Sequence, residues 1–391
     1  MKNVVIIDGA RTAIGTFRGS LKDFSVTDLG AIVIEAALKR AKVGKDQVDE
    51  VIMGCVGQVA EDAFMARRCA IKAGIPAETS TAFTVNRLCS SGLQAIVSGM
   101  MSIQTGDAEI VVAGGGESMS NLPFYIRNGR EYKMGHQQLE DGLITALTDP
   151  FSGQHMGITA ENVAEKYSIS REDQDKWALR SQQLAAKAIE EGVFKDEIVP
   201  VHVKRRKEEF DFDTDEHVRP GTTLEKLAKL RPAFKADGTV TAGNASGMND
   251  GAAAVVMMSE DKAKELGLVP KLRIVAQACG GVDPSIMGTG PIVSTRKCLE
   301  RAGMALEEID EIELNEAFAA QTLACIRELG MDESKVNIHG SGISIGHPIG
   351  CTGAMLTVKL LYSMPKTGAR YGLETLCIGG GQGLTVIYER I

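Results

Sequence analysis

The segment ALKRAKVGKDQVDEVIM, residues 37–53, recurs in altered form as CLERAGMALEEIDEIEL, residues 298–314. At this offset of 261 residues, five of the 17 positions are identical and four more exchange one apolar residue for another. The same offset aligns NRLCSSGLQA, residues 86–95, with HPIGCTGAML, residues 347–356. Matches that follow one another in the same order indicate that the chain contains two similar halves.

Each half shows strands alternating with helices. In the first half, VVIID (residues 4–8) has the pattern of a strand, and residues 27–42 carry apolar side chains at helical spacing. A third match, VVAGGGES in residues 111–118 with LCIGGGQG in residues 376–383, adds a buried strand and a glycine turn to each half at an offset of 265. We therefore predict an α/β protein of duplicated halves, each with a largely parallel, helix-covered sheet, in which the two sheets pack through a shared helical layer.

The segment between the repeats, residues 118–248, has no counterpart in either half. Ser170 to Asp173 predicts the capped start of a long helix that stops at Gly192. We interpret the segment as an inserted loop domain that covers one face, where ligand contacts tend to lie. The predicted division is residues 1–117 and 249–268 for the N-terminal half, 118–248 for the insertion, and 269–391 for the C-terminal half.

The composition excludes several classes of protein. Of 391 residues, 44% are hydrophobic and 24% charged, as in soluble globular proteins, and the formal net charge of −8 argues against binding to nucleic acid or to an anionic membrane. We also expect no transmembrane segment, and the absence of a signal pattern at the start leads us to expect a cytoplasmic protein. The eight cysteines form no CxxC pair, which predicts neither a disulfide framework nor a metal site.

Cys89 and His347 occupy matching turns of the two halves. Cys89 follows a predicted strand and opens a helix, where the positive end of the helix dipole favours the thiolate over the thiol. This residue is either a nucleophile or a buried cysteine at a close-packed helix start. His347 lies in GHPIG, and if pseudo-twofold symmetry brings the two turns together it faces Cys89 as a base. A lone histidine is more often structural.

Two further segments carry candidate residues. Cys377 ends a predicted strand in CIGGGQG, where a thiol can move a proton and bare glycine N–H groups can hold an oxyanion, although glycine turns after strands are common. Asn315 in NEAFA can orient a water or a carbonyl group. The alternative interpretation of Asn315 is a helix N-cap.

Taken together, these motifs resemble those of the thiolase family, and the resemblance extends over essentially the whole chain. VNRLCSSG, GGGESMSNLP, NEAFA, GHPIG and CIGGGQG occur in family order, with RTAIGTFRGSL near the start and NASGMNDGAAA at the end of the insertion. The loops QHMG (residues 154–157) and IMGTGP (residues 286–291) resemble those of short-chain acetyl-CoA acetyltransferases of the biosynthetic type. The resemblance implies a layered α-β-α-β-α fold.

The resemblance also implies a role for each candidate residue. Cys89 is expected to accept the acyl group, His347 to activate Cys89, and Cys377 to remove a proton from a second acetyl-CoA. Asn315 is expected to hold a water that forms one oxyanion hole with His347, and the backbone N–H groups of Cys89 and Gly379 to form the other. The residues expected to contact the acyl group or coenzyme A are Leu147, His155, Met156, Arg219, Phe234, Ala242, Ser246, Met287 and Phe318.

The implied activity is the reversible condensation of two acetyl-CoA to acetoacetyl-CoA and CoA through an acetyl-Cys89 intermediate. Coenzyme A is then substrate and product, and no cofactor or metal is expected. The resemblance further implies a homotetramer, with residues 121–141, including Phe124, Tyr125 and Tyr132, as a candidate contact loop. The alternatives are a degradative 3-ketoacyl-CoA thiolase of broader chain length, a condensing enzyme of the ketoacyl synthase type, against which Cys377 argues, and a non-catalytic acyl-CoA or lipid carrier.

Some residues raise separate questions. Cys351 and Thr352 replace the small residues often found after GHPIG, and we interpret Cys351 as a packing residue. The basic run Lys204–Lys207 is interpreted as a solvated face rather than a phosphate site, because acidic residues follow it. Two catalytic thiols in one pocket predict that mild oxidation links Cys89 and Cys377 and that thiol reductants restore the lost activity. Inactivation that persists after reduction contradicts this.

Overall fold

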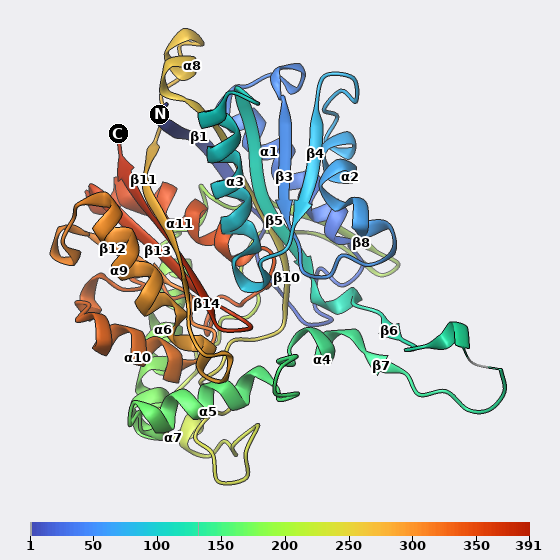
Figure 1. Ribbon diagram of the computed structural model, residues 1–391, viewed down its shortest axis with the longest axis vertical. Coiled ribbons are helices and arrows are strands. Elements are labelled where there is room, and N and C mark those ends of the chain that lie inside the picture. The colour runs from blue at the N-terminus through green and yellow to red at the C-terminus, as the bar shows by residue number, and fades with distance from the viewer. Residues whose placement is uncertain (1, 132) are drawn as a thin grey trace.

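The computed structural model describes residues 2–131 and 133–391 (Figure 1). Within these residues, ten strands form one hydrogen-bonded sheet in the order β12-β13-β14-β11-β1-β10-β5-β3-β4, with β2 paired to β10. The N-terminal half supplies β1 (Val4–Arg11), β2 (Gly15–Thr16), α1 (Val26–Ala41), β3 (Glu50–Gly54), α2 (Met65–Lys72), β4 (Thr81–Val85), α3 (Ser91–Thr105), β5 (Ile110–Ser118), β10 (Asn249–Ser259) and α8 (Glu260–Glu265). The C-terminal half supplies β11 (Leu272–Gly281), α9 (Gly290–Ala302), β12 (Glu311–Leu314), α10 (Ala319–Leu329), α11 (Thr352–Thr367), β13 (Tyr371–Ile378) and β14 (Gln382–Arg390).

The prediction of largely parallel sheets is wrong. Parallel pairing is confined to β3 with β4 and β5, and to β12 with β13, whereas the other pairings of the main sheet are antiparallel. The connections explain the difference. A short turn joins β13 to β14, so the two strands are antiparallel, and β10 follows the insertion and pairs antiparallel with β5. The strands of the two halves also meet, because Val5 and Ile6 of β1 pair with Arg273 and Leu272 of β11.

The helices form the predicted layers. α3 and α11 lie side by side between the two halves, and glycines permit their close approach. A Cβ on Gly92 of α3 would lie 2.7 Å from the backbone nitrogen of Ala354, so no larger residue fits there without displacing α11. On the outer faces, α1 and α2 cover strands of the first half and α9 covers strands of the second (Figure 1). The α-β-α-β-α arrangement is therefore confirmed.

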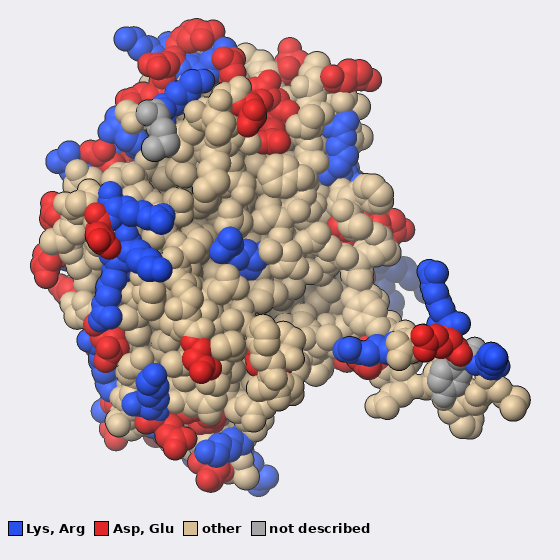
Figure 2. Space-filling view, in the orientation of Figure 1, with Lys and Arg blue, Asp and Glu red and all other residues tan. Residues whose placement is uncertain are grey.

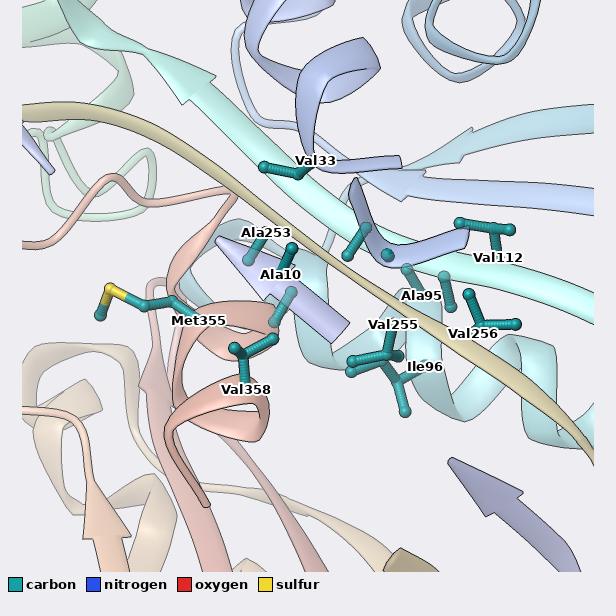
Figure 3. Packing of buried hydrophobic residues seen from close by; sticks show 14 of the residues in the cluster. Ala10, Val33, Ala95, Ile96, Val112, Ala253, Val255, Val256, Met355 and Val358 are labelled. Atoms are coloured by element: carbon teal, nitrogen blue, oxygen red, sulfur yellow. The ribbon is translucent and has the colours of Figure 1, made fainter. Parts of the chain in front are cut away.

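The main hydrophobic core fills the space between the strands and the central helices. Figure 3 shows Ala253 and Val255 of β10, Ile96 of α3, and Met355 and Val358 of α11 in this cluster. All five side chains are buried. Because the core joins both halves, the two turns that open α3 and α11 are held in a fixed relation to each other.

The insertion leaves the sheet where β5 ends at Ser118 and returns where β10 begins at Asn249. The predicted long helix is confirmed as α6: the Ser170 hydroxyl accepts a hydrogen bond from the Asp173 backbone nitrogen at 3.0 Å. The insertion contains β6 (Phe124–Tyr125), β7 (Glu140–Asp141), α4 (Gly142–Ala146), α5 (Met156–Lys166), α6 (Arg171–Glu190), β8 (Val201–Arg205), β9 (Glu208–Phe212) and α7 (Leu224–Ala228). The division into three units matches these strand ends and remains our proposal.

A buried ion-pair cluster fastens the insertion to the first half. Arg11 of β1 is fully buried and lies 2.6 Å from a Glu197 carboxylate oxygen and 2.8 Å from an Asp215 carboxylate oxygen. Asp215 also accepts from the backbone nitrogen of Ile14. Breaking such a buried pair leaves an uncompensated charge, so this contact fixes where the insertion crosses the sheet.

Candidate active site

Cys89 lies in a short 3-10 turn, Leu88–Ser90, between β4 and α3. Leu88 has a φ of 46°, in the left-handed region that a branched side chain rarely adopts. Hydrogen bonds hold this strained turn: the Asn86 side chain accepts from Leu88 N at 2.9 Å, and the Ser91 hydroxyl donates to Leu88 O at 2.7 Å. This turn places the half-buried Cys89 between a strand and the start of α3, as the sequence predicted.

His347 is buried in the matching turn before α11, and its contacts fix its tautomer. Its Nδ1 lies 2.6 Å from the Thr352 hydroxyl, and that hydroxyl donates to the carbonyl of Pro348. Thr352 must therefore accept the Nδ1 proton, which leaves a lone pair on Nε2. The Asn315 amide nitrogen lies 3.3 Å from Nε2, and the backbone nitrogen of His347 donates to Asn249 Oδ1. The imidazole is oriented as a proton acceptor at Nε2.

Asn315 stands at the end of β12, with its backbone nitrogen bonded to Thr375 O. Its side-chain oxygen is buried and has no hydrogen-bond partner in the described part of the chain. A buried orphan acceptor costs about 1–3 kcal/mol, so a donor from solvent or substrate is expected here. The N-cap interpretation of Asn315 is wrong, because α10 is capped by Phe318.

Cys377 and Gly379 come from the β13–β14 hairpin and meet Cys89. The backbone N–H groups of Gly379 and of Cys89 itself lie close enough to the Cys89 sulfur to lower the pKa of its thiol. Cys377 is fully buried at the end of β13; burial raises the pKa of its thiol well above the usual value, and the nearby Cys89 sulfur raises it further. The structure therefore brings Cys89, Cys377 and Gly379 together. The predicted oxidation of the two thiols stays a prediction.

The helix start is expected to favour the thiolate of Cys89, but burial opposes this and has the larger effect on the pKa of the thiol. Burial raises the pKa of Cys89 to about 11, against the lowering effect of the two backbone N–H groups. Burial also lowers the pKa of His347 to about 4. Both shifts favour a neutral thiol and a neutral imidazole in the free site.

The predicted acyl-pocket residues surround Cys377. Met156, Met287, Phe234 and Phe318 belong to the same apolar cluster as Cys377. The His155 ring stacks on the Phe234 ring with centroids 4.7 Å apart, and Phe234 meets Phe318 edge to face at 6.2 Å. A Cβ on Gly379 would lie 3.4 Å from the Met156 methyl group, which brings α5 to the hairpin.

The remaining predicted contacts fall in separate places. Arg219 and Ala242 line a hollow of about 360 Å³ together with His217 and Lys226, whose nitrogens suit an anionic group. Ser246 donates from its backbone nitrogen to Ala317 O, between this hollow and the acyl pocket. Leu147 instead packs on the Cys89 side, with Met119 and Ile349.

Three residues of the site were missed by sequence reasoning: Thr352, Asn249 and Glu117. Thr352 orients His347. The sequence feature that could have revealed this role is a hydroxyl residue in the first turn of the helix after the histidine. Asn249 holds the His347 backbone from the end of the insertion. Glu117 accepts from backbone nitrogens beside Cys89 and His347, and only the motif GGGES pointed to it.

The arrangement agrees with family models over nearly the whole chain. Residues 4–261 match the thiolase N-terminal domain, and residues 268–390 match the thiolase C-terminal domain. The chain belongs to the thiolase family. The resemblance inferred from the motifs is thereby confirmed.

Relatives of this thiolase cover its full length. It is 52% identical to the acetyl-CoA acetyltransferase of Syntrophomonas wolfei and 52% identical to the beta-ketothiolase BktB of Cupriavidus necator, with 100% of each chain covered. Its structure superposes on the crystal structure of the Bacillus anthracis acetyl-CoA acetyltransferase with a TM-score of 0.97, at 50% identity and covering 100% and 99% of the two chains.

Proposed function

We propose that this thiolase is an acetyl-CoA C-acetyltransferase, which condenses two acetyl-CoA to acetoacetyl-CoA and CoA and also runs the reverse thiolysis. One observation carries the proposal: the sulfur of Cys89 meets the N–H groups of Gly379 and Cys89, with the thiol of Cys377 beside it. A thiol nucleophile, two oxyanion donors and a second thiol are the groups that a two-step acyl transfer needs. Relatives named acetyl-CoA acetyltransferase support the acetyl group as the unit transferred.

In the first step, His347 Nε2 takes the proton of Cys89 while the sulfur attacks the thioester carbonyl of acetyl-CoA. The developing oxyanion is bonded to the carbon that the sulfur attacks, two bonds from the sulfur, and we propose that the Gly379 and Cys89 N–H groups beside the sulfur stabilise it. One such donor contributes about 3 kcal/mol to transition-state stabilisation. CoA departs as a thiolate and takes the proton of Cys377, which leaves acetyl-Cys89, a Cys377 thiolate and a protonated His347.

In the second step, Cys377 removes a proton from the methyl group of the second acetyl-CoA. The enolate oxygen is stabilised by a water held between Asn315 and His347. Its carbon attacks acetyl-Cys89, the Cys89 sulfur leaves and recovers the proton of His347, and acetoacetyl-CoA is released.

The hollow lined by Arg219, Ala242, His217 and Lys226 is proposed to hold the phosphate-bearing part of coenzyme A, and the nearby segment around Ser246, bonded to Ala317, to contact its thiol arm. Coenzyme A is then substrate and product, and the mechanism uses no cofactor or metal. Met156, Met287, Phe234 and Phe318 fill the space around Cys377 and favour a short acyl group over a long one.

We also propose that the enzyme is a cytoplasmic homotetramer. No helix in residues 2–131 and 133–391 is long and apolar enough to cross a membrane. Charged side chains gather at the rim of the face in Figure 2, around a largely uncharged centre. Phe83 of the edge strand β4 and Met101 of α3 are exposed, as are Phe124 and Ile126 of the projecting β6–β7 arm, which is the predicted contact loop. Tyr132 of that loop lies outside the described residues.

Mass spectrometry after brief incubation with acetoacetyl-CoA and CoA tests the proposal. We expect an acetyl adduct on the Cys89 peptide that added CoA discharges. The adduct should be absent in Cys89→Ala and present in the matched control Cys351→Ala, which removes a buried thiol with no proposed role. No adduct and no consumption of acetoacetyl-CoA would contradict the proposal, and activity on a ladder of chain lengths would then test the broader 3-ketoacyl-CoA alternative.

A further inference from the structure

Glu316, just beyond the end of β12, is fully buried and has no part in the mechanism above. Its carboxylate accepts hydrogen bonds from neutral donors at both oxygens. Oε1 accepts from Trp177 Nε1 at 3.0 Å and from Asn337 Nδ2 at 2.9 Å. Oε2 accepts from the Ser181 hydroxyl at 2.6 Å and from the Ile343 backbone nitrogen at 3.3 Å. A buried carboxylate is stable only where such donors replace water, so Glu316 and its partners hold one another in place.

These donors come from two separate parts of the chain. Two lie on α6 of the insertion, and the other two lie in the segment between α10 and α11 that leads to His347. The Ser181 hydroxyl also lies 2.8 Å from the Ser344 hydroxyl of that segment. Glu316 therefore fastens residues 337–344 both to the insertion and to the end of β12.

The same segment packs on the amide group of Asn315. Gly342 precedes the Ile343 nitrogen that Glu316 binds, and a Cβ on Gly342 would lie 2.8 Å from Asn315 Oδ1 and 2.7 Å from the Glu316 carbonyl oxygen. Because Asn315 Oδ1 has no hydrogen-bond partner within residues 2–131 and 133–391, the packing of Gly342 limits how far this amide can turn. Support for Gly342 is thus support for Asn315.

On its other side, Ile343 borders the hollow proposed for coenzyme A. There the Ile343 carbonyl oxygen accepts from Gln182 Nε2 at 3.2 Å, and Gln182 Oε1 accepts from the Arg219 backbone nitrogen at 2.7 Å. These contacts do not involve Glu316. Loss of the Glu316 contact should therefore disturb the Asn315 side of the segment more than the hollow.

We propose that Glu316 is a positioning residue for the condensation step, which holds Gly342 and Ile343 against Asn315 and so keeps the Asn315 amide where it can bind the water. The proposal rests on the role of Asn315 in the proposed function. Glu316 does not line the hollow proposed for coenzyme A, so it acts on the reaction through this segment.

Glu316→Gln tests the contact without a change of size. Glutamine must turn its NH2 group towards one pair of donors, and the side-chain nitrogens of Trp177 and Asn337 can only donate. The NH2 group should therefore face Ser181, whose hydroxyl can turn and accept, and Ile343, whose backbone nitrogen cannot. The variant thus loses the hydrogen bond to Ile343.

Hydrogen–deuterium exchange of the substrate-free protein, followed by peptide mass spectrometry, reads this loss directly. The backbone nitrogens of residues 343–346 are all hydrogen-bonded in the wild type. In Glu316→Gln we expect their exchange to be at least about tenfold faster, because the segment opens more often. This readout needs no catalysis, so its outcome is separate from that of the acetyl-adduct test.

Asp310→Asn is the matched control. Asp310 accepts from the backbone nitrogens of Arg370 and Tyr371 at the other end of β12, so the control removes a carboxylate that also binds backbone N–H groups. Exchange of residues 343–346 in this variant should equal that of the wild type.

A double variant shows whether Glu316 acts through Asn315. We expect Glu316→Gln to lower kcat for condensation about tenfold, with a smaller change in KM. In an Asn315→Ala background the same substitution should lower kcat by less than about twofold, because the group that Glu316 positions is already gone. A purely structural loss would be the same in both backgrounds.

Three results would each overturn the proposal: unchanged exchange of residues 343–346 in Glu316→Gln, faster exchange to the same extent in Asp310→Asn, or the full loss of kcat in the Asn315→Ala background. If Glu316→Gln does not fold, Ser181→Ala removes one donor of the same oxygen and the contact with Ser344. It is judged by the same three results, with exchange and kcat expected to change about threefold.

Discussion

The two halves of this thiolase use the same glycine run in opposite ways. In the first half, Gly114–Gly116 lie inside strand β5, which leads into the insertion. In the second half, Gly379–Gly381 form the turn between β13 and β14, where Gly380 and Gly381 have φ of 77° and 83°. β10 lies antiparallel to β5 as β14 lies antiparallel to β13. The insertion thus occupies the place of a three-residue turn. At this place the first half has the inserted segment, whereas the second half has the proposed oxyanion donor Gly379.

The matching turns before the central helices also divide the chemistry between them. In the first half the turn carries Cys89, whereas the aligned residue of the second half is Gly350, whose N–H is bound by Glu117. His347 of the second half aligns with Asn86, whose side chain holds the strained Leu88. The two halves therefore share one fold, but the turn before α3 carries Cys89 and the matching turn before α11 carries His347.

The largest expected effect concerns a buried charge pair that only the second half has. Lys359 of α11 lies 2.8 Å from a carboxylate oxygen of Glu313, and both side chains are buried. The aligned residues of the first half, Ser98 and Ile52, form no ion pair because neither is charged. Lys359→Met leaves Glu313 uncompensated and should cost about 3–5 kcal/mol of the free energy of unfolding. Thermal and urea unfolding measure this loss.

The same variant should respond to pH in a defined direction. Burial raises the pKa of Glu313 to about 7, against the lowering effect of Lys359. A carboxyl whose folded pKa lies above its unfolded value binds more protons when folded, so it supports stability at low pH and loses that support as pH rises towards 7. Without Lys359 the pKa of Glu313 rises further, so the stability gap to the wild type should widen from pH 6 to pH 8. A gap that narrows would contradict this account of the pair.

Asn315→Ala tests the oxyanion donor of the second half. Removal of one preorganised donor typically lowers kcat by about 100- to 1000-fold. Because the water proposed to lie between Asn315 and His347 stabilises the enolate of the second step, the loss should appear in kcat for condensation, while acetylation of Cys89 by acetyl-CoA is less affected. Steady-state condensation rates and the rate of adduct formation separate the two steps. Equal losses in both would assign Asn315 to the first step as well.

Alanine substitutions in the two glycine runs compare strand with turn. A Cβ on Gly115 would overlap the carbonyl oxygen of Gly350 and lie 2.9 Å from Gly92 Cα, so Gly115→Ala should cost about 3 kcal/mol through overpacking. At Gly380 the nearest atom to a Cβ is a Phe151 ring carbon at 3.6 Å, so Gly380→Ala should cost only about 1 kcal/mol, from its positive φ. If Gly380→Ala lowered the unfolding midpoint more than Gly115→Ala, the assignment of the first glycine run to a close-packed strand and of the second to an open turn would be wrong.

The smallest loss of stability is expected for Asp49 and Asp310, two aligned residues that make the same contacts in the two halves. Asp49 accepts from Glu109 N and Ile110 N, and its repeat counterpart Asp310 accepts from Arg370 N and Tyr371 N. Asp49→Asn and Asp310→Asn should each lower the free energy of unfolding by about 1 kcal/mol. Urea titrations of the two variants should agree within about 0.5 kcal/mol.

Sequence reasoning succeeded where a pattern reports directly on structure. The repeat predicted the duplicated halves, and the capped start at Ser170 predicted α6. Strand direction was predicted wrongly, because periodicity reveals which face of a strand is buried and not how its neighbour runs. The raised pKa of the Cys89 thiol could not be predicted from the sequence, because it depends mainly on how deeply the fold buries the sulfur. Thr352 and Asn249 act on His347 through tertiary contacts that no local motif displays.

The central claim is that the first half stores the acyl group and the second half makes the carbon nucleophile. Incubating Cys377→Ala with acetyl-CoA, and following intact mass together with acetoacetyl-CoA formation, tests it most directly. The account predicts that acetyl-Cys89 accumulates while acetoacetyl-CoA formation falls at least about 1000-fold. Wild-type rates of acetoacetyl-CoA formation in Cys377→Ala, or acetylation at another residue, would contradict it.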